Sequence, residues 1–102
     1  MIYNKLVRDK IPAIIEANGQ KPVTRILDEE EYMASLEQKL DEEVQEFHRD
    51  QNLEELADIL EVVYALTEAG GYTRQELFAV CDQKKEARGG FKDRIFLISN
   101  EG

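Results

Sequence analysis

The fold is decided by the stretch from Lys39 to Asp58, which reads KLDEEVQEFHRDQNLEELAD. Glu43 and Glu46 are three residues apart, so on a helix they lie one turn apart on the same face. Glu55 and Asp58 have the same spacing beyond a short polar turn. Both pairs are centred on that turn. In an antiparallel hairpin, Glu46 therefore lies opposite Glu55, and Glu43 lies opposite Asp58. Because packed helix axes lie about 8–10 Å apart, four carboxylates meet in one small volume if both faces point inward.

Converging carboxylates repel one another unless a cation lies between them. Oxygen-only ligation suits a hard cation, and the set contains no histidine or cysteine, which favours Mg²⁺ or Mn²⁺ over zinc. Each acid also has a simpler interpretation. Glu55 could serve only as the capping-box partner of Asn52, and Glu43 and Glu46 could be solvent-facing acids of an amphipathic helix. The spacing alone leaves both interpretations open.

Helix signals continue on both sides of this stretch. Asp9 is a candidate cap for a short helix with Pro12 in its first turn, and Asn18-Gly19 ends it. Capping boxes are expected where Asp28, Asn52 and Thr73 are each followed three residues later by glutamate. The sequence therefore predicts helices over about 9–18, 28–49, 53–69 and 73–88, an extended connector over 21–27 and an extended or irregular tail over 91–99.

The third predicted helix is apolar nearly all round, which is typical of a buried helix. A chain of 102 residues is one domain, 1–102, with a modest core of its own, so burial of this helix calls for a partner subunit. We predict an all-α fold, a small helical bundle with a central antiparallel hairpin, completed by homo-oligomerisation into a dimer or tetramer.

Charge and composition exclude several classes of protein. The net charge of −9 argues against nucleic-acid binding, and no apolar run is long enough to span a membrane. The single cysteine, Cys81, permits no internal disulfide and is expected to be a buried thiol in a cytoplasmic protein. His48 is expected to be a solvated helix residue. Residues 28–70 carry fifteen acidic and two basic side chains, whereas both ends are net basic. This distribution suits either solvated helix faces or a central cation site with phosphates at its edge.

The acidic pattern resembles the all-α nucleoside triphosphate pyrophosphatases, a superfamily that includes MazG-like proteins and phosphoribosyl-ATP pyrophosphohydrolases. The resemblance lies in Glu42-Glu43-x-x-Glu46 followed by Glu55-x-x-Asp58. The opening YNKLVRDKIP at 3–12, RGGF at 88–91 and RI at 94–95 look like a phosphoribosyl-ATP pyrophosphohydrolase-like subgroup. The start and end differ from the histidine-biosynthesis enzyme itself, so phosphoribosyl-ATP is an alternative substrate beside nucleoside triphosphates.

The resemblance implies a magnesium-dependent enzyme that hydrolyses the α–β phosphoanhydride of a nucleotide to release pyrophosphate. The implied metal ligands are Glu43, Glu46, Glu55 and Asp58, and Glu42 or Glu46 would accept a proton from the attacking water. Cations expected at the substrate phosphates are Lys39, Lys5, Arg8, Lys10, Lys84 and Arg88, and each of the last five could equally be a surface charge. The competing hypothesis is a non-catalytic helical dimerisation or regulatory module.

Overall fold

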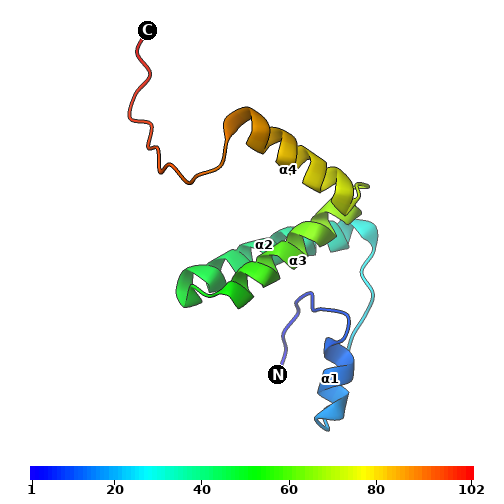
Figure 1. Ribbon diagram of the computed structural model, residues 1–102. Helices are drawn as coiled ribbons and strands as arrows, with labels where there is room; N and C mark the ends of the chain where they lie inside the picture. The colour runs from blue at the N-terminus through cyan, green and yellow to red at the C-terminus, as the bar shows by residue number, and fades with distance from the viewer.

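The computed structural model describes residues 1–102 and contains four helices and no strand (Figure 1). The helices are α1 (Ile11–Ala17), α2 (Glu29–Asp50), α3 (Leu53–Ala69) and α4 (Arg74–Arg88). The prediction of an all-helical chain is therefore confirmed, and the predicted tail after residue 90 has no regular structure. None of the four helices has both the length and the apolar character needed to cross a bilayer.

Helices α2 and α3 lie side by side and run in opposite directions (Figure 1). Gln51 ends α2 in the left-handed conformation with φ 53°, which turns the chain sharply. Asn52 then caps α3, because its side chain accepts a hydrogen bond of 3.0 Å from the Glu55 N–H. Leu36 of α2 and Val62 of α3 are the two buried apolar residues of the chain. The small core therefore lies within this helix pair.

The predicted caps are formed to different extents. Thr73 and Glu76 make a complete capping box at the start of α4. At α2, Asp28 accepts from the Glu31 N–H, but the Glu31 carboxylate bonds Arg25 instead of returning to the cap. The expected capping box is therefore only half formed at α2, and the same holds at α3, where only the Asn52 half is present.

The predicted cap of the first helix is wrong, because α1 begins after Lys10 and has no side-chain cap. A capping Asp9 would need the N–H of the second or third helical residue. The N–H of Ile11 already donates to the Arg8 carbonyl at 3.1 Å, and Pro12 has no N–H to offer. Both donors that Asp9 needs are therefore lost.

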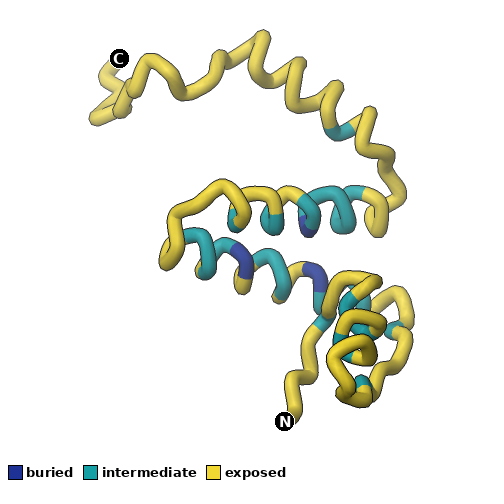
Figure 2. The backbone as a smooth tube through the Cα atoms, turned by 60° about the horizontal axis from the view of Figure 1, so that its bottom comes forward, coloured by how far each residue is buried: buried dark blue, intermediate teal, exposed yellow.

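One chain is open in shape, with extents of 63 × 32 × 22 Å and a radius of gyration of 18.1 Å. A compact chain of this length has a radius of gyration of about 13 Å. Helix α1 packs on no other helix, and α4 contacts only α3, near the elbow that joins them (Figure 2). The four helices do not close into a bundle within one chain.

Two burial predictions are wrong for a single chain for this reason. In α3, which was expected to be buried all round, Leu56 is 45% exposed and Leu60 is 46% exposed. Cys81 of α4 is exposed as well, since no element of the same chain covers that part of the helix. His48 is exposed, as expected.

Candidate metal centre

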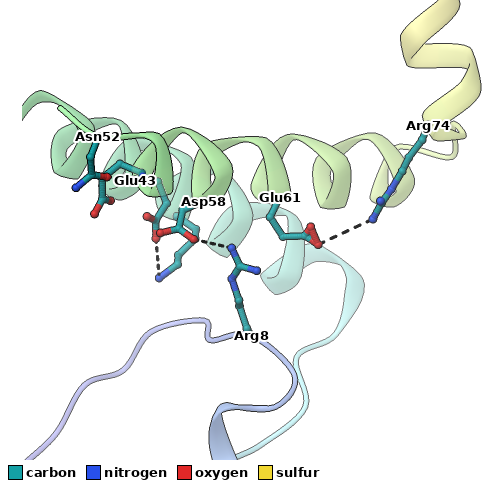
Figure 3. A network of polar contacts seen from close by, with 8 residues as sticks. Arg8, Glu43, Asn52, Asp58, Glu61 and Arg74 are labelled. Atoms are coloured by element: carbon teal, nitrogen blue, oxygen red, sulfur yellow. Dashed lines mark hydrogen bonds and ion pairs between the residues drawn. The ribbon is translucent and has the colours of Figure 1, made fainter. Parts of the chain in front are cut away.

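Three of the four predicted ligands come together between α2 and α3 near the turn of the hairpin. Figure 3 shows two of them, Glu43 and Asp58. Glu43, Glu55 and Asp58 each offer a carboxylate oxygen, and these atoms all lie within 4.8 Å of one another. Glu43 comes from α2, and the other two come from the first two turns of α3. The matched spacing across the turn therefore produces the predicted convergence for these three acids.

Glu43 is the only buried charged residue of the chain, with 6% of its surface exposed. Its Oε1 lies 3.3 Å from Lys39 Nζ, whereas its Oε2 is buried and accepts no hydrogen bond. Burial raises the pKa of Glu43, the Lys39 ammonium lowers it, and the neighbouring Glu46 raises it again. A buried acceptor without a partner is costly, and its presence calls for an explanation such as a bound ion.

Glu55 of α3 also has a buried carboxylate oxygen, Oε2, that accepts no hydrogen bond. The pKa of Glu55 is raised first by burial and then by the negative charges around it, of which Glu46 is the largest. The Glu55 carboxylate does not complete a capping box with Asn52, so the interpretation of Glu55 as only a capping partner is wrong. The side chain is instead part of the acidic cluster.

Glu46, the fourth predicted ligand, lies outside the 4.8 Å group but close enough for its charge to act on both Glu43 and Glu55. Glu42 lies outside the group too, and its Oε2 is 3.6 Å from Lys39 Nζ. The two predicted proton acceptors therefore flank the cluster.

Of the predicted phosphate-binding cations, the structure brings only Lys39 and Arg8 to the acids. Lys39 contacts Glu42 and Glu43, as given above. An Arg8 Nη atom lies 2.6 Å from an Asp58 Oδ atom and donates a hydrogen bond to it (Figure 3). This pairing was missed by sequence reasoning, which assigned Arg8 to phosphate. The one available signal was the basic start opposite an acidic middle segment.

None of the remaining predicted cations forms an ion pair with the acids of the cluster. Lys5 stacks its ammonium over the Tyr3 ring at 5.5 Å, and Lys10 sits at the start of α1. Lys84 and Arg88 are exposed on α4, which leaves the hairpin at the end opposite its turn (Figure 1). Within one chain, these four side chains do not reach the acids.

The donor set fits a hard divalent cation. All three atoms are carboxylate oxygens, and two of the three residues have an oxygen that nothing else in the chain satisfies. The three oxygens lie within 4.8 Å of one another, so their carboxylates could share one divalent ion after side-chain adjustment. Water or substrate oxygens would complete the coordination, as is usual for Mg²⁺.

Comparison with known proteins adds one relative. The chain is 57% identical over 42 residues to a protein of Mycolicibacterium smegmatis described as uncharacterized, and the match covers 41% of this chain and 43% of that protein. No protein-family model matches the sequence. No solved structure matches it. The case for an activity therefore depends on the site itself.

Proposed function

We propose that this protein is a magnesium-dependent nucleoside triphosphate pyrophosphohydrolase, similar to the all-α pyrophosphatases that its acidic motif resembles. The observation that carries the proposal is the pair of buried, unpartnered oxygens, Glu43 Oε2 and Glu55 Oε2, in one cluster with Asp58. An ordinary acidic helix face would direct these carboxylates to water. A cation at this position would satisfy both oxygens and offset the burial and the charge repulsion that raise both pKa values.

The proposed reaction joins a water oxygen to the α-phosphorus and breaks the bond from that phosphorus to the bridging oxygen of the β-phosphate. The products are a nucleoside monophosphate and pyrophosphate. When bound, Mg²⁺ would offset phosphate charge and favour ionisation of the attacking water. Glu46 or Glu42, at the edge of the cluster, would take the proton of that water on a carboxylate oxygen.

Lys39 suits a phosphate-binding role because α2 holds it beside the cluster. Its ammonium is mostly buried and lies between Glu42 and Glu43 at 3.6 and 3.3 Å. A cation held in this way can attract the phosphates of a nucleotide without a large loss of side-chain freedom. Arg8 supplies a second cation, whose guanidinium can bind two phosphate oxygens at once.

We also propose that two or more copies of the chain complete the fold. One copy exposes 9512 Å², whereas a compact monomer of this mass exposes about 5,900 Å². Two copies that each buried this excess of about 3,600 Å² would bury roughly 7,200 Å² together, at or beyond the upper end of the obligate homodimer range. Lys84, Lys85 and Arg88 of one copy would then be available to the acidic cluster of another, which would explain why α4 carries basic side chains away from its own hairpin. Light scattering of the purified protein tests this part directly.

The activity is tested with a substrate panel of ribonucleoside and deoxyribonucleoside triphosphates and phosphoribosyl-ATP, with Mg²⁺ and detection of pyrophosphate. Glu55→Gln should reduce turnover by on the order of 100-fold or more, since even groups that only support metal ligands are worth about 10–100-fold. The matched control is Glu54→Gln, which removes an exposed acid from the adjacent position. Turnover of Glu55→Gln at the wild-type rate would remove the cluster from the mechanism. Phosphoribosyl-ATP as the single substrate would favour the histidine-biosynthesis alternative.

The alternative of a non-catalytic dimerisation module is supported by the exposed apolar residues of α3, including Leu56 and Leu60. Such a module would oligomerise, and its melting temperature would not respond to nucleotide plus Mg²⁺. The enzyme hypothesis requires a rise, because a ligand that binds only the folded state stabilises it.

A further inference from the structure

The contact between Arg8 and Asp58 joins two parts of the chain that otherwise share no polar contact. Among all hydrogen bonds and ion pairs, it alone connects residues 1–24 to the helices that follow. Helix α1, which follows Arg8, packs on no other helix. The side chains of Arg8 and Asp58 are both partly exposed, at 56% and 39%. The N-terminal segment is therefore attached to the hairpin through a member of the candidate metal centre.

Asp58 belongs to two interactions that oppose each other. One of its oxygens accepts from the guanidinium at 2.6 Å, and its carboxylate is also one of the three groups within 4.8 Å. A divalent ion bound to this carboxylate would lie within about 5 Å of the guanidinium, where the two positive charges repel. Lys39 differs, because it is mostly buried and fixed one turn from Glu43 on the same helix. Arg8 is the cation that can leave.

We propose that Arg8 competes with the divalent cation for Asp58, so that binding of the ion releases Arg8 and the N-terminal segment from the hairpin. The released guanidinium stays tethered near the site and becomes available to the phosphates of the nucleotide. Binding of metal and binding of nucleotide are thereby coupled through one side chain. The inference rests on the proposed function for the cation. It adds that the divalent ion replaces Arg8 at Asp58 and that Arg8 then binds the nucleotide phosphates.

The first test is Mn²⁺ binding without nucleotide, measured by electron paramagnetic resonance of the free ion. Arg8→Gln should bind Mn²⁺ about two- to fivefold more tightly than the wild-type protein, the range that an exposed ion pair is worth. Arg25→Gln is the matched control, because Arg25 also forms an exposed pair, 2.8 Å from Glu31 and away from the cluster. Its Mn²⁺ affinity should equal that of the wild-type protein.

A second measurement separates release of the segment from a simple change in charge. Addition of Mg²⁺ should lower the ¹⁵N heteronuclear NOE of residues 5–9 in the wild-type protein, and these residues should already have low values in Arg8→Gln. Unchanged NOE values in the wild-type protein, or an Arg8→Gln variant with equal or weaker Mn²⁺ affinity, would overturn the competition. Wild-type protein that binds no Mn²⁺, or binds it as well after Glu55→Gln, would overturn the metal centre itself and the competition with it.

Discussion

Glu43 of α2 and Glu55 of α3 each contribute a buried carboxylate oxygen that accepts no hydrogen bond, and both belong to the same cluster at the turn of the hairpin. Each residue alone would be one buried acceptor without a hydrogen bond. Together they leave two unsatisfied acceptors and a concentration of negative charge in one place, which is the arrangement that a divalent cation stabilises.

Substitution of Glu55 should stabilise the metal-free protein and weaken its binding of metal. In the presence of a chelator, Glu55→Gln should raise the melting temperature by a few degrees. Burial and then charge repulsion raise the Glu55 pKa, and a neutral amide costs less to bury than a carboxylate and is not repelled. The same variant should lose the rise in melting temperature that Mg²⁺ gives the wild-type protein. Differential scanning fluorimetry with and without Mg²⁺ measures both effects. Glu54→Gln, at the adjacent exposed position, should behave like the wild-type protein.

The pH dependence of stability follows from the raised pKa values. Glu43 and Glu55 have pKa values above the ordinary glutamate value of 4.5, mainly because of burial. When the pH lies between 4.5 and the raised pKa values, the two glutamates bind more protons in the folded state than in the unfolded state. Without metal, Glu43 and Glu55 should therefore contribute to the stability of the folded state below pH 4.5. This stability should be lost as the pH rises through their folded-state pKa values.

Metal affinity should change in the opposite direction over the same pH interval, because protons compete with the ion for both carboxylates. Titration calorimetry with Mn²⁺ at a series of pH values should show affinity rising with pH above the ordinary glutamate pKa. An affinity independent of pH across this interval would place the ion on other groups.

The stability of the hairpin should depend on its small core. Leu36→Ala should cost about 2–4 kcal/mol, since it removes most of a buried side chain and leaves a cavity. Leu53→Ala removes the same atoms from an exposed position at the start of α3 and should change stability by less than about 0.5 kcal/mol. Urea unfolding followed by circular dichroism gives both values. Equal effects of the two substitutions would show that α2 and α3 do not pack as described.

Arg74 should hold α4 to α3. Its guanidinium lies 3.5 Å from Glu68, 3.9 Å from Glu61 and 4.2 Å from the centre of the Tyr64 ring. These exposed interactions together are worth about 1 kcal/mol. Arg74→Ala should therefore speed amide hydrogen exchange in residues 74–88 several-fold and leave residues 36–62 unchanged. Arg49→Ala, which removes an exposed pair with the adjacent Asp50, is the control and should leave α4 unaffected.

The helices could be predicted from the sequence because their signals are local. The third helix was expected over 53–69 and is observed as Leu53–Ala69, since an asparagine cap begins it and a glycine pair ends it. The convergence of Glu43 with Glu55 and Asp58 also follows from local spacing, once the turn between α2 and α3 is fixed.

Other features depend on which surfaces meet in space, and the sequence does not specify them. Cys81 lies among apolar neighbours along the chain, which predicted burial, but no element of the same chain covers it. Arg8 and Asp58 are fifty positions apart, so their pairing leaves no periodic signal. Glu46 has the same spacing from Glu43 as Asp58 has from Glu55, yet Asp58 belongs to the 4.8 Å group and Glu46 does not, so spacing alone does not decide which acids converge.

The central claim is tested most directly by hydrolysis of a nucleoside triphosphate in H₂¹⁸O with Mg²⁺, followed by ³¹P NMR of the products. If the acidic cluster of the hairpin acts as proposed, the wild-type protein yields nucleoside monophosphate carrying ¹⁸O together with unlabelled pyrophosphate, and Glu55→Gln yields neither. The absence of turnover with every triphosphate, ¹⁸O found in inorganic phosphate, or labelled monophosphate formed equally by Glu55→Gln would contradict it.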